Sequence, residues 1–145
     1  MGLRIPSYGE ICQAEARLRP VIAHTPVIHT ARWNALLKLE NLQKTGAYKV
    51  RGATNALTVQ VNAGDRRPVV AASAGNHSAG MAWAARHLGL RATAVVPTNA
   101  PRAKINSTRR LGAEVIVRGD TFEEAKVHAH HLAERHDWRF LHAFD

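Results

Sequence analysis

Short apolar runs alternate along this chain with longer segments in which apolar residues recur every three or four positions. The runs are rich in valine and alanine, and runs of this length favour buried strands. The expected strands cover residues 69–72, 92–96, 113–117 and 139–142. The expected helices beside them cover residues 78–88, 101–111 and 121–136. This alternation predicts an α/β fold, with an open, parallel, twisted sheet and helices on both faces.

The part of the chain before residue 62 predicts fewer strands. An amphipathic helix is expected over 7–18, with Ser7 as its N-cap and Glu10 completing a capping box. Residues 24–27 are expected to be extended, because Thr25 precedes a proline. The other elements expected here are a strand over 35–40 and a helix over 48–61.

Composition and cysteine use are those of a globular protein. The chain has 145 residues, of which 46% are hydrophobic and 21% charged, and no repeat or linker divides it, so we expect a single unit over 1–145. Its one cysteine, Cys12, excludes an internal disulfide and is expected to be packed. Residues 1–6 hold too few apolar side chains for a signal peptide, and no run is long enough to cross a bilayer. We therefore expect a cytoplasmic protein without membrane contact.

The net charge of +9 raises the question of an anionic partner. No acidic residue lies between Asp65 and Glu114, a stretch rich in arginine. These basic residues are spread over several expected elements, and aromatic residues do not alternate with them. The pattern therefore favours attraction of small anions over specific nucleic-acid binding.

Four histidines lie in the last expected helix, at positions 128, 130, 131 and 136. His128 and His131 are three positions apart, which places both side chains on one helix face. No carboxylate or cysteine completes a recognisable ligand set, and a solvated helix face accounts for the same pattern. We therefore expect no metal site.

The most informative stretch is 69–80, Val-Val-Ala-Ala-Ser-Ala-Gly-Asn-His-Ser-Ala-Gly. It predicts a buried strand, a tight turn and the start of a helix, whose first N–H groups and dipole attract a carboxylate or a phosphate. The side chains of Ser73, Asn76 and His77 add donors, and Gly75 lets a ligand approach the backbone closely. A purely structural interpretation, in which Ser73 or Asn76 only caps the helix, stays open.

A second stretch, 38–53, has the sequence Lys-Leu-Glu-Asn-Leu-Gln-Lys-Thr-Gly-Ala-Tyr-Lys-Val-Arg-Gly-Ala. Together with Ser-Ala-Gly-Asn-His at 73–77 and Leu-Gly-Ala-Glu-Val at 111–115, it resembles the pyridoxal-phosphate-dependent threonine/serine dehydratases, which share a fold with the serine racemases. The resemblance implies the small cofactor domain of the tryptophan synthase β-like fold. The domain would occupy 51–145, behind an N-terminal arm over 1–50 that carries the cofactor lysine at its end.

The resemblance also assigns roles to single residues. Lys49 matches the lysine that holds the cofactor, pyridoxal 5'-phosphate, as a Schiff base and later moves protons at the substrate Cα, which requires a primary amine. Its pKa must be lowered to about neutral, and we expect burial or the nearby Arg51 to do so. Asn76 matches the residue that hydrogen-bonds the phenolic oxygen of the cofactor. The residues expected to hold the substrate carboxylate are Ser73, Gly75, Asn76 and His77.

The reaction implied is the elimination of water and ammonia from L-threonine or L-serine, which gives a 2-oxo acid. Racemase-like members usually carry a second serine, an acid/base on the opposite face of the ring, where this chain has Ala74. Elimination is therefore favoured, with serine racemase-like activity as an alternative. Ala47 and Tyr48 also differ from the residues frequent in the family, and we expect them to tune the site.

Members of this family are usually more than twice as long, and their later half carries the loop around the cofactor phosphate and the partner of the pyridine nitrogen. We therefore expect a truncated portion in which the C-terminal half of the family fold is absent and residues 141–145 lead toward it. That half, or a homo-oligomer, would complete the site for a small amino-acid substrate, and we expect little turnover by the isolated chain. The alternative is a non-catalytic remnant or subunit that binds a small anion or a partner chain.

Overall fold

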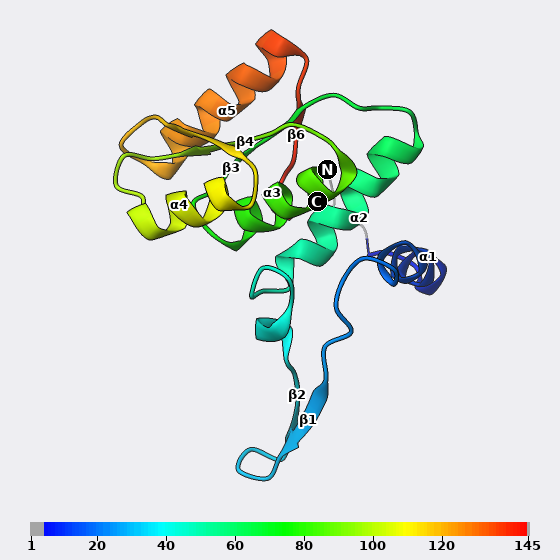
Figure 1. Ribbon diagram of the computed structural model, residues 1–145. Coiled ribbons are helices and arrows are strands. Elements are labelled where there is room, and N and C mark those ends of the chain that lie inside the picture. Colours follow the sequence, from blue (N-terminus) through cyan, green and yellow to red (C-terminus); the bar gives the residue numbers. More distant parts are fainter. Residues whose placement is uncertain (1–4, 145) are drawn as a thin grey trace.

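The computed structural model describes residues 5–144 of the chain (Figure 1). Residues 1–4, which contribute to the expectation that a signal peptide is absent, lie outside the described part. The same holds for Asp145, the last residue of the segment expected to lead toward a larger domain. The described chain has an α/β body and an N-terminal part with a helix and a projecting hairpin.

A four-stranded parallel sheet forms the centre of the body, in the order β5-β4-β3-β6. The strands are β3 Val69–Ala72, β4 Ala92–Val96, β5 Glu114–Val117 and β6 Arg139–Phe140. In the register, Val70 lies between Thr93 of β4 and Phe140 of β6. Every residue of β3 and β4 is buried, which explains why both strands are continuous apolar runs rather than alternating ones.

Helices cover both faces of this sheet, as the sequence pattern predicts. They are α2 Lys49–Asn62, α3 Asn76–Leu88, α4 Arg102–Arg110 and α5 Phe122–His136. Ala125 and Ala129 of α5 pack with Val70 on one face. Leu57 of α2 and Met81 of α3, both fully buried, belong to the core on the other face.

The boundaries of the expected elements agree with the observed ones to within two residues at either end. The capping box of the first helix is confirmed: the Ser7 Oγ accepts from the Glu10 N–H at 3.3 Å, and a Glu10 carboxylate oxygen accepts from the Ser7 N–H at 2.8 Å. Thr121 caps α5 through the Glu124 N–H. Gly89 ends α3 with a φ of 67°, a left-handed conformation that favours glycine.

The N-terminal part contains a hairpin, of which the sequence predicts the second strand but neither the first strand nor the pairing. Its strands, β1 Val27–Thr30 and β2 Ala35–Lys38, pair antiparallel. Residues 31–34 form the turn, where Asn34 has a φ of 44°, which asparagine tolerates. Both strands are exposed along most of their length, so no alternation between a buried and a solvated face marks them. A short 3₁₀ helix, η1 Glu40–Leu42, connects the hairpin toward α2.

Helix α1, Tyr8–Leu18, lies against α2 and buries little of its own surface. Leu18 is its one buried residue, and the Arg17 Nε donates to the Asn55 side-chain oxygen of α2 at 2.8 Å. Cys12 is a free, exposed thiol, so the expectation that it is packed was wrong. The reason is that α1 contacts the body near its C-terminal end, while Cys12 lies nearer its start.

Candidate functional site

The two motif stretches of the sequence meet beside one end of the sheet. β3 leads through the turn at 73–75 into α3, and Lys49 is the first residue of α2. Helices α2 and α3 pack against each other. In open α/β sheets, ligands bind beyond the carboxyl ends of the strands, which is where the turn after β3 lies.

The Lys49 amine lies in a cleft of about 260 Å³. Nζ donates a hydrogen bond to the Ala143 carbonyl at 2.8 Å, and it lies 4.6 Å from the centre of the Phe144 ring and 5.5 Å from that of Tyr48. Residues 141–144 therefore form one wall of the cleft. The sequence predicts that this segment leads away from the domain, and it gives no sign of the contact with Lys49.

Ser73 organises the turn that leads into α3. Its Oγ accepts hydrogen bonds from the backbone N–H groups of Gly75 at 3.1 Å and Ser78 at 3.4 Å. Because Ser78 lies in the first turn of α3, Ser73 satisfies one of the helix's free donors, as the structural interpretation predicts. A hydroxyl that accepts two hydrogen bonds still has a proton to donate. Ser73 is therefore able to hold the turn and donate to an anion at the same time.

The first two N–H groups of α3, those of Asn76 and His77, have no hydrogen-bond partner within residues 5–144. The N-cap position is Gly75, without a side-chain cap, so Asn76 does not cap the helix. The Asn76 side chain is exposed. Two free amide donors, the positive end of the helix dipole and the Asn76 side chain therefore form a donor set suited to an anion.

The His77 ring is engaged with the C-terminal segment. The side chain is buried, and its Nε2 lies 2.9 Å from the Leu141 carbonyl oxygen. A carbonyl only accepts, so Nε2 carries the proton in this contact. Burial is the main cause that lowers the pKa of His77; the Leu141 hydrogen bond opposes it, and the charges of Lys49 and His142 add to it. The backbone N–H of His77, rather than its ring, is thus the group open to a carboxylate.

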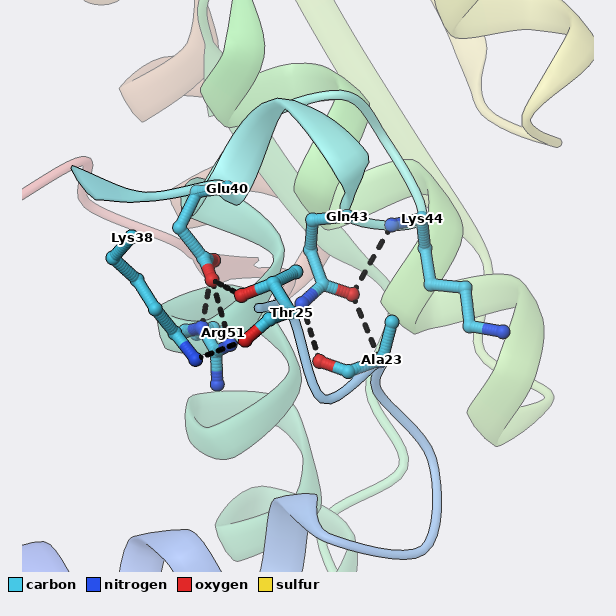
Figure 2. Close-up of polar contacts among 7 residues, drawn as sticks. All are labelled: Ala23, Thr25, Lys38, Glu40, Gln43, Lys44 and Arg51. Carbon is cyan, nitrogen blue, oxygen red and sulfur yellow. Dashed lines mark hydrogen bonds and ion pairs between the residues drawn. The ribbon is translucent and has the colours of Figure 1, made fainter. Parts of the chain in front are cut away.

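An ion pair holds the first turn of α2 (Figure 2). The Arg51 guanidinium donates two hydrogen bonds of 2.7 Å to the Glu40 carboxylate, and the Thr25 hydroxyl donates a third at 2.5 Å. The Lys38 amine donates to the Thr25 carbonyl at 2.6 Å. The Arg51 hydrogen bonds lower the pKa of Glu40 to about 2, with Thr25 and Lys38 contributing and desolvation opposing. The sequence indicates Arg51 but not its partner.

Gln43 adds a second link between the same segments. Its side-chain oxygen accepts from the Ala23 N–H at 2.9 Å and from the Lys44 N–H at 3.1 Å, and its amide nitrogen donates to the Ala23 carbonyl at 2.9 Å (Figure 2). The buried Gln43 side chain thus satisfies both backbone polar groups of Ala23, as a neighbouring strand would in a sheet. The chain before the hairpin is thus fixed to the chain after it, and the Glu40–Arg51 pair fixes the latter to the start of α2.

The predicted site residues lie in two adjoining places. Lys49 and His77 line the cleft, and Ser73, Gly75 and Asn76 form the turn and helix start beside it. The structure thus brings together the residues that the two motifs contribute. Their roles toward a cofactor and a substrate stay predictions.

The histidine-rich helix α5 shows the face that its spacing predicts. The rings of His128 and His131 stack with 6.4 Å between centroids. Within residues 5–144, no group of three or more His, Cys, Asp or Glu side chains is arranged to hold a metal ion. Among the same residues, no helix has both the length and the apolar character needed to span a membrane.

Comparisons with known protein families, curated proteins and solved structures all find similar proteins. A family model described as "Pyridoxal-phosphate dependent enzyme" matches residues 18–145. The catabolic L-threonine dehydratase TdcB of Staphylococcus aureus (strain USA300) is 38% identical over 148 residues, which cover 97% of this chain and 43% of that protein. The chain thus spans less than half the length of this curated relative.

Two solved structures show the same fold. A threonine deaminase from T.th. matches with a TM-score of 0.85 and 35% identity, over 97% of this chain and 46% of that one. Maize serine racemase matches with a TM-score of 0.86 and 30% identity, over 94% of this chain and 44% of that one. The α/β body and the N-terminal part together are therefore similar to a portion of these enzymes.

Proposed function

We propose a function from the premise that this chain belongs to the pyridoxal-phosphate-dependent enzyme family, whose model matches residues 18–145. We propose that it supplies the lysine-bearing part of an ammonia-lyase that eliminates water and ammonia from L-threonine or L-serine. The threonine dehydratase and threonine deaminase relatives support this reaction. The observation that carries the proposal is the Lys49 amine in a cleft next to the open N-terminus of α3.

The residues present fit pyridoxal phosphate as the cofactor. When bound, this group supplies an electron-accepting ring that stabilises negative charge at the substrate Cα. Lys49 is the primary amine that would hold it covalently and move protons at the Cα, and its Nζ is held by a single carbonyl hydrogen bond that a ligand can replace. The exposed Asn76 would donate to the phenolic oxygen of the ring.

The substrate carboxylate would lie at the start of α3. The free N–H groups of Asn76 and His77, the helix dipole and the Ser73 hydroxyl all favour a negative charge there. The neutral His77 ring does not compete for the carboxylate, because it is bound to the Leu141 carbonyl. The substrate carboxylate would be held at the start of α3, and the cofactor would be held at Lys49. Together these two contacts would orient the substrate's amino group toward Lys49.

A serine racemase-like activity is the second candidate, and the similarity to maize serine racemase is what favours it. Racemisation requires a proton donor on the face of the ring opposite to Lys49. Ala74, the residue at the position expected for that donor, has no ionisable group and packs against the main core. Elimination is therefore the better supported reaction.

The remaining cofactor contacts would come from polypeptide outside these 145 residues, either a further part of the protein or another subunit. This follows from the family resemblance and from the share of the relatives that the chain covers, 43% for the threonine dehydratase. A cofactor attached through Lys49 but lacking contacts to its phosphate binds weakly. The 145-residue chain alone is therefore expected to release little ammonia from threonine.

The test is covalent trapping of the cofactor. The purified chain is mixed with pyridoxal phosphate and reduced with borohydride, and the labelled lysine is mapped by mass spectrometry, with Lys49→Ala as the control. Stoichiometric labelling at Lys49 that disappears in the variant supports the proposal. Labelling scattered over Lys38, Lys44 and the other lysines would favour a non-catalytic protein that binds small anions.

A further inference from the structure

Gly80 ends the 69–80 stretch and takes no part in the chemistry proposed above. It lies inside α3 and is buried. Glycine destabilises a helix interior relative to alanine, and the backbone of Gly80 is not in the left-handed region that would require it. Its presence therefore calls for a reason in packing.

The reason is a close approach between two backbones. A Cβ atom at Gly80 would lie 3.0 Å from the carbonyl carbon of Lys49, 3.1 Å from its oxygen and 3.0 Å from the nitrogen of Val50. These are backbone atoms of the first turn of α2, so no side-chain rotation can make room. Val50 is completely buried, and α2 cannot retreat locally without disturbing the core.

The face of α3 that carries Gly80 also carries the residues of the donor set. His77 and Asn76 precede Gly80 by three and four positions, and residues at these spacings lie on one helix face. His77 lines the same cleft as Lys49. The backbone contact at Gly80 is thus about one helical turn from the groups that Lys49 must work with.

We propose that Gly80 is a positioning residue for Lys49. Because it has no side chain, α3 lies directly on the backbone that carries Lys49, and this contact sets the distance between the Lys49 amine and the N-terminus of α3. An alanine at this position would push the two helices apart at that point. The amine would leave the place from which it can serve a ligand held by Asn76 and His77.

Gly9 provides a matched control, because it lies in a helix, α1, does not line the cleft around Lys49, and a Cβ there would meet nothing within 4 Å. Gly80→Ala and Gly9→Ala make the same chemical change in two helices, but only the first meets another backbone. The first readout is the rate at which a small acylating reagent modifies Lys49, measured across pH by mass spectrometry with Lys104 and Lys126 as internal references. This readout needs no cofactor.

We expect Gly80→Ala to raise the acylation rate of Lys49 about threefold or more, because the hydrogen bond from the Lys49 amine to the Ala143 carbonyl is lost. The acylation rates of the reference lysines should not change. Borohydride trapping of pyridoxal phosphate on Lys49 should fall about tenfold, since misplacing a reacting group by about 1 Å can cost about a hundredfold and the shift expected here is smaller. Gly9→Ala should behave like the unmodified protein in both. Equal behaviour of the two variants would overturn the proposal.

The trapping readout rests on the proposed function, but the acylation readout does not. If pyridoxal phosphate fails to label the unmodified protein, the function fails while the acylation rates still test Gly80. If Gly80→Ala does not fold, NMR of glycine-labelled protein with the natural sequence tests the contact between Gly80 and the start of α2 instead. A nuclear Overhauser effect between the Gly80 Hα and the Val50 N–H is then expected, together with a shift of the Gly80 signals when Lys49 is acylated. The absence of either would overturn the proposal.

Discussion

The charge of Arg51 is paired rather than free, which changes how Lys49 should be understood. Both hydrogen bonds from the guanidinium go to Glu40, although Arg51 is only two helix positions away from Lys49. From the sequence, either burial or the nearby positive charge of Arg51 is expected to lower the pKa of Lys49. In the structure Arg51 holds the first turn of α2 to Glu40, whose carboxylate also accepts from Thr25, so Arg51 helps to fix the backbone that carries Lys49.

Glu40→Gln should therefore destabilise the fold in a pH-dependent way. The folded-state pKa of Glu40, about 2, lies below its ordinary value of 4.5. Its contribution is thus fully present above about pH 5 and is lost as the pH falls toward 2. Because the pair is partly exposed, we expect the variant to lose about 1–2 kcal/mol of unfolding free energy at pH 7. Urea denaturation at several pH values measures this loss.

Glu15→Gln is the control for this experiment. Glu15 forms an ion pair of 2.7 Å with Arg19 on α1, but both side chains are largely exposed. Solvent screens such a pair, so the variant should unfold like the unmodified protein at every pH. A Glu40→Gln protein as stable as the control at pH 7, or equally destabilised at pH 2 and pH 7, would contradict the role given to Glu40.

The His77 ring should titrate below its ordinary pKa of 6.5, because burial disfavours the charged imidazole. The folded protein is thus stabilised by neutral His77 above that pH, and this contribution is lost as the pH falls. NMR titration of the ring protons, assigned with His77→Gln, measures the midpoint. Lys49→Met should raise it, since the Lys49 charge is one cause of the lowered pKa, whereas Lys104→Met should not. A midpoint at or above 6.5 in the unmodified protein would refute the expectation.

The residues of the site differ in how far the sequence predicts them. Lys49, Ser73 and Asn76 stand in contiguous motifs, so the sequence indicates them directly. The Lys49 contact with Ala143 joins residues 94 positions apart, and no local pattern carries such information. The same is true of the partner that Arg51 finds in Glu40, 11 positions away, because only the folded path of the chain brings them together.

At the scale of elements, α1 and α5 are capped alike but held differently. Ser7 and Thr121 each accept from the N–H three residues on, at 3.3 and 3.2 Å. α5 packs on the sheet through Ala125 and Ala129, whereas α1 buries only Leu18. A cap contributes to global stability only where its helix unfolds together with the core.

Thr121→Ala should accordingly lower the global unfolding free energy by about 1 kcal/mol, the usual value of an N-cap. Ser7→Ala should leave the global value unchanged and speed hydrogen exchange in α1 alone, because α1 opens locally. Chemical denaturation and hydrogen exchange by mass spectrometry distinguish the two responses. A global loss for Ser7→Ala equal to that for Thr121→Ala would show that α1 belongs to the cooperative core.

How well the sequence predicts each helix or strand depends on how much of that element is buried. The central strands β3 and β4 are apolar at almost every position because helices cover both faces, so composition alone indicates them. The β1–β2 hairpin is exposed on both faces, and its strands carry no period of two. Its turn contains Asn34 but no Asn-Gly pair, the strongest short hairpin signal. Where the structure imposes no burial pattern, the sequence cannot display one.

At the scale of the whole molecule, two opposing features decide how copies of this chain interact. The hairpin exposes Leu36 to 71% and Trp33 to 65%, and an isolated two-stranded hairpin is marginally stable in water. The net charge of +9 makes copies repel one another. Salt screens the repulsion but not the apolar attraction.

Self-association should therefore strengthen as salt rises from about 50 to 500 mM, a range over which the screening length shortens severalfold. Sedimentation velocity measures it, with Leu36→Ser expected to weaken association at high salt. Val127→Ser, which removes an apolar side chain 68% exposed on α5, is the matched control and should have no effect. Binding to nucleic acid has the opposite salt dependence, because counterion release makes its affinity fall steeply as salt rises.

Assemblies that dissociate as salt rises would thus indicate an electrostatic partner. Assemblies that grow with salt and depend on Leu36 would locate the contact on the hairpin.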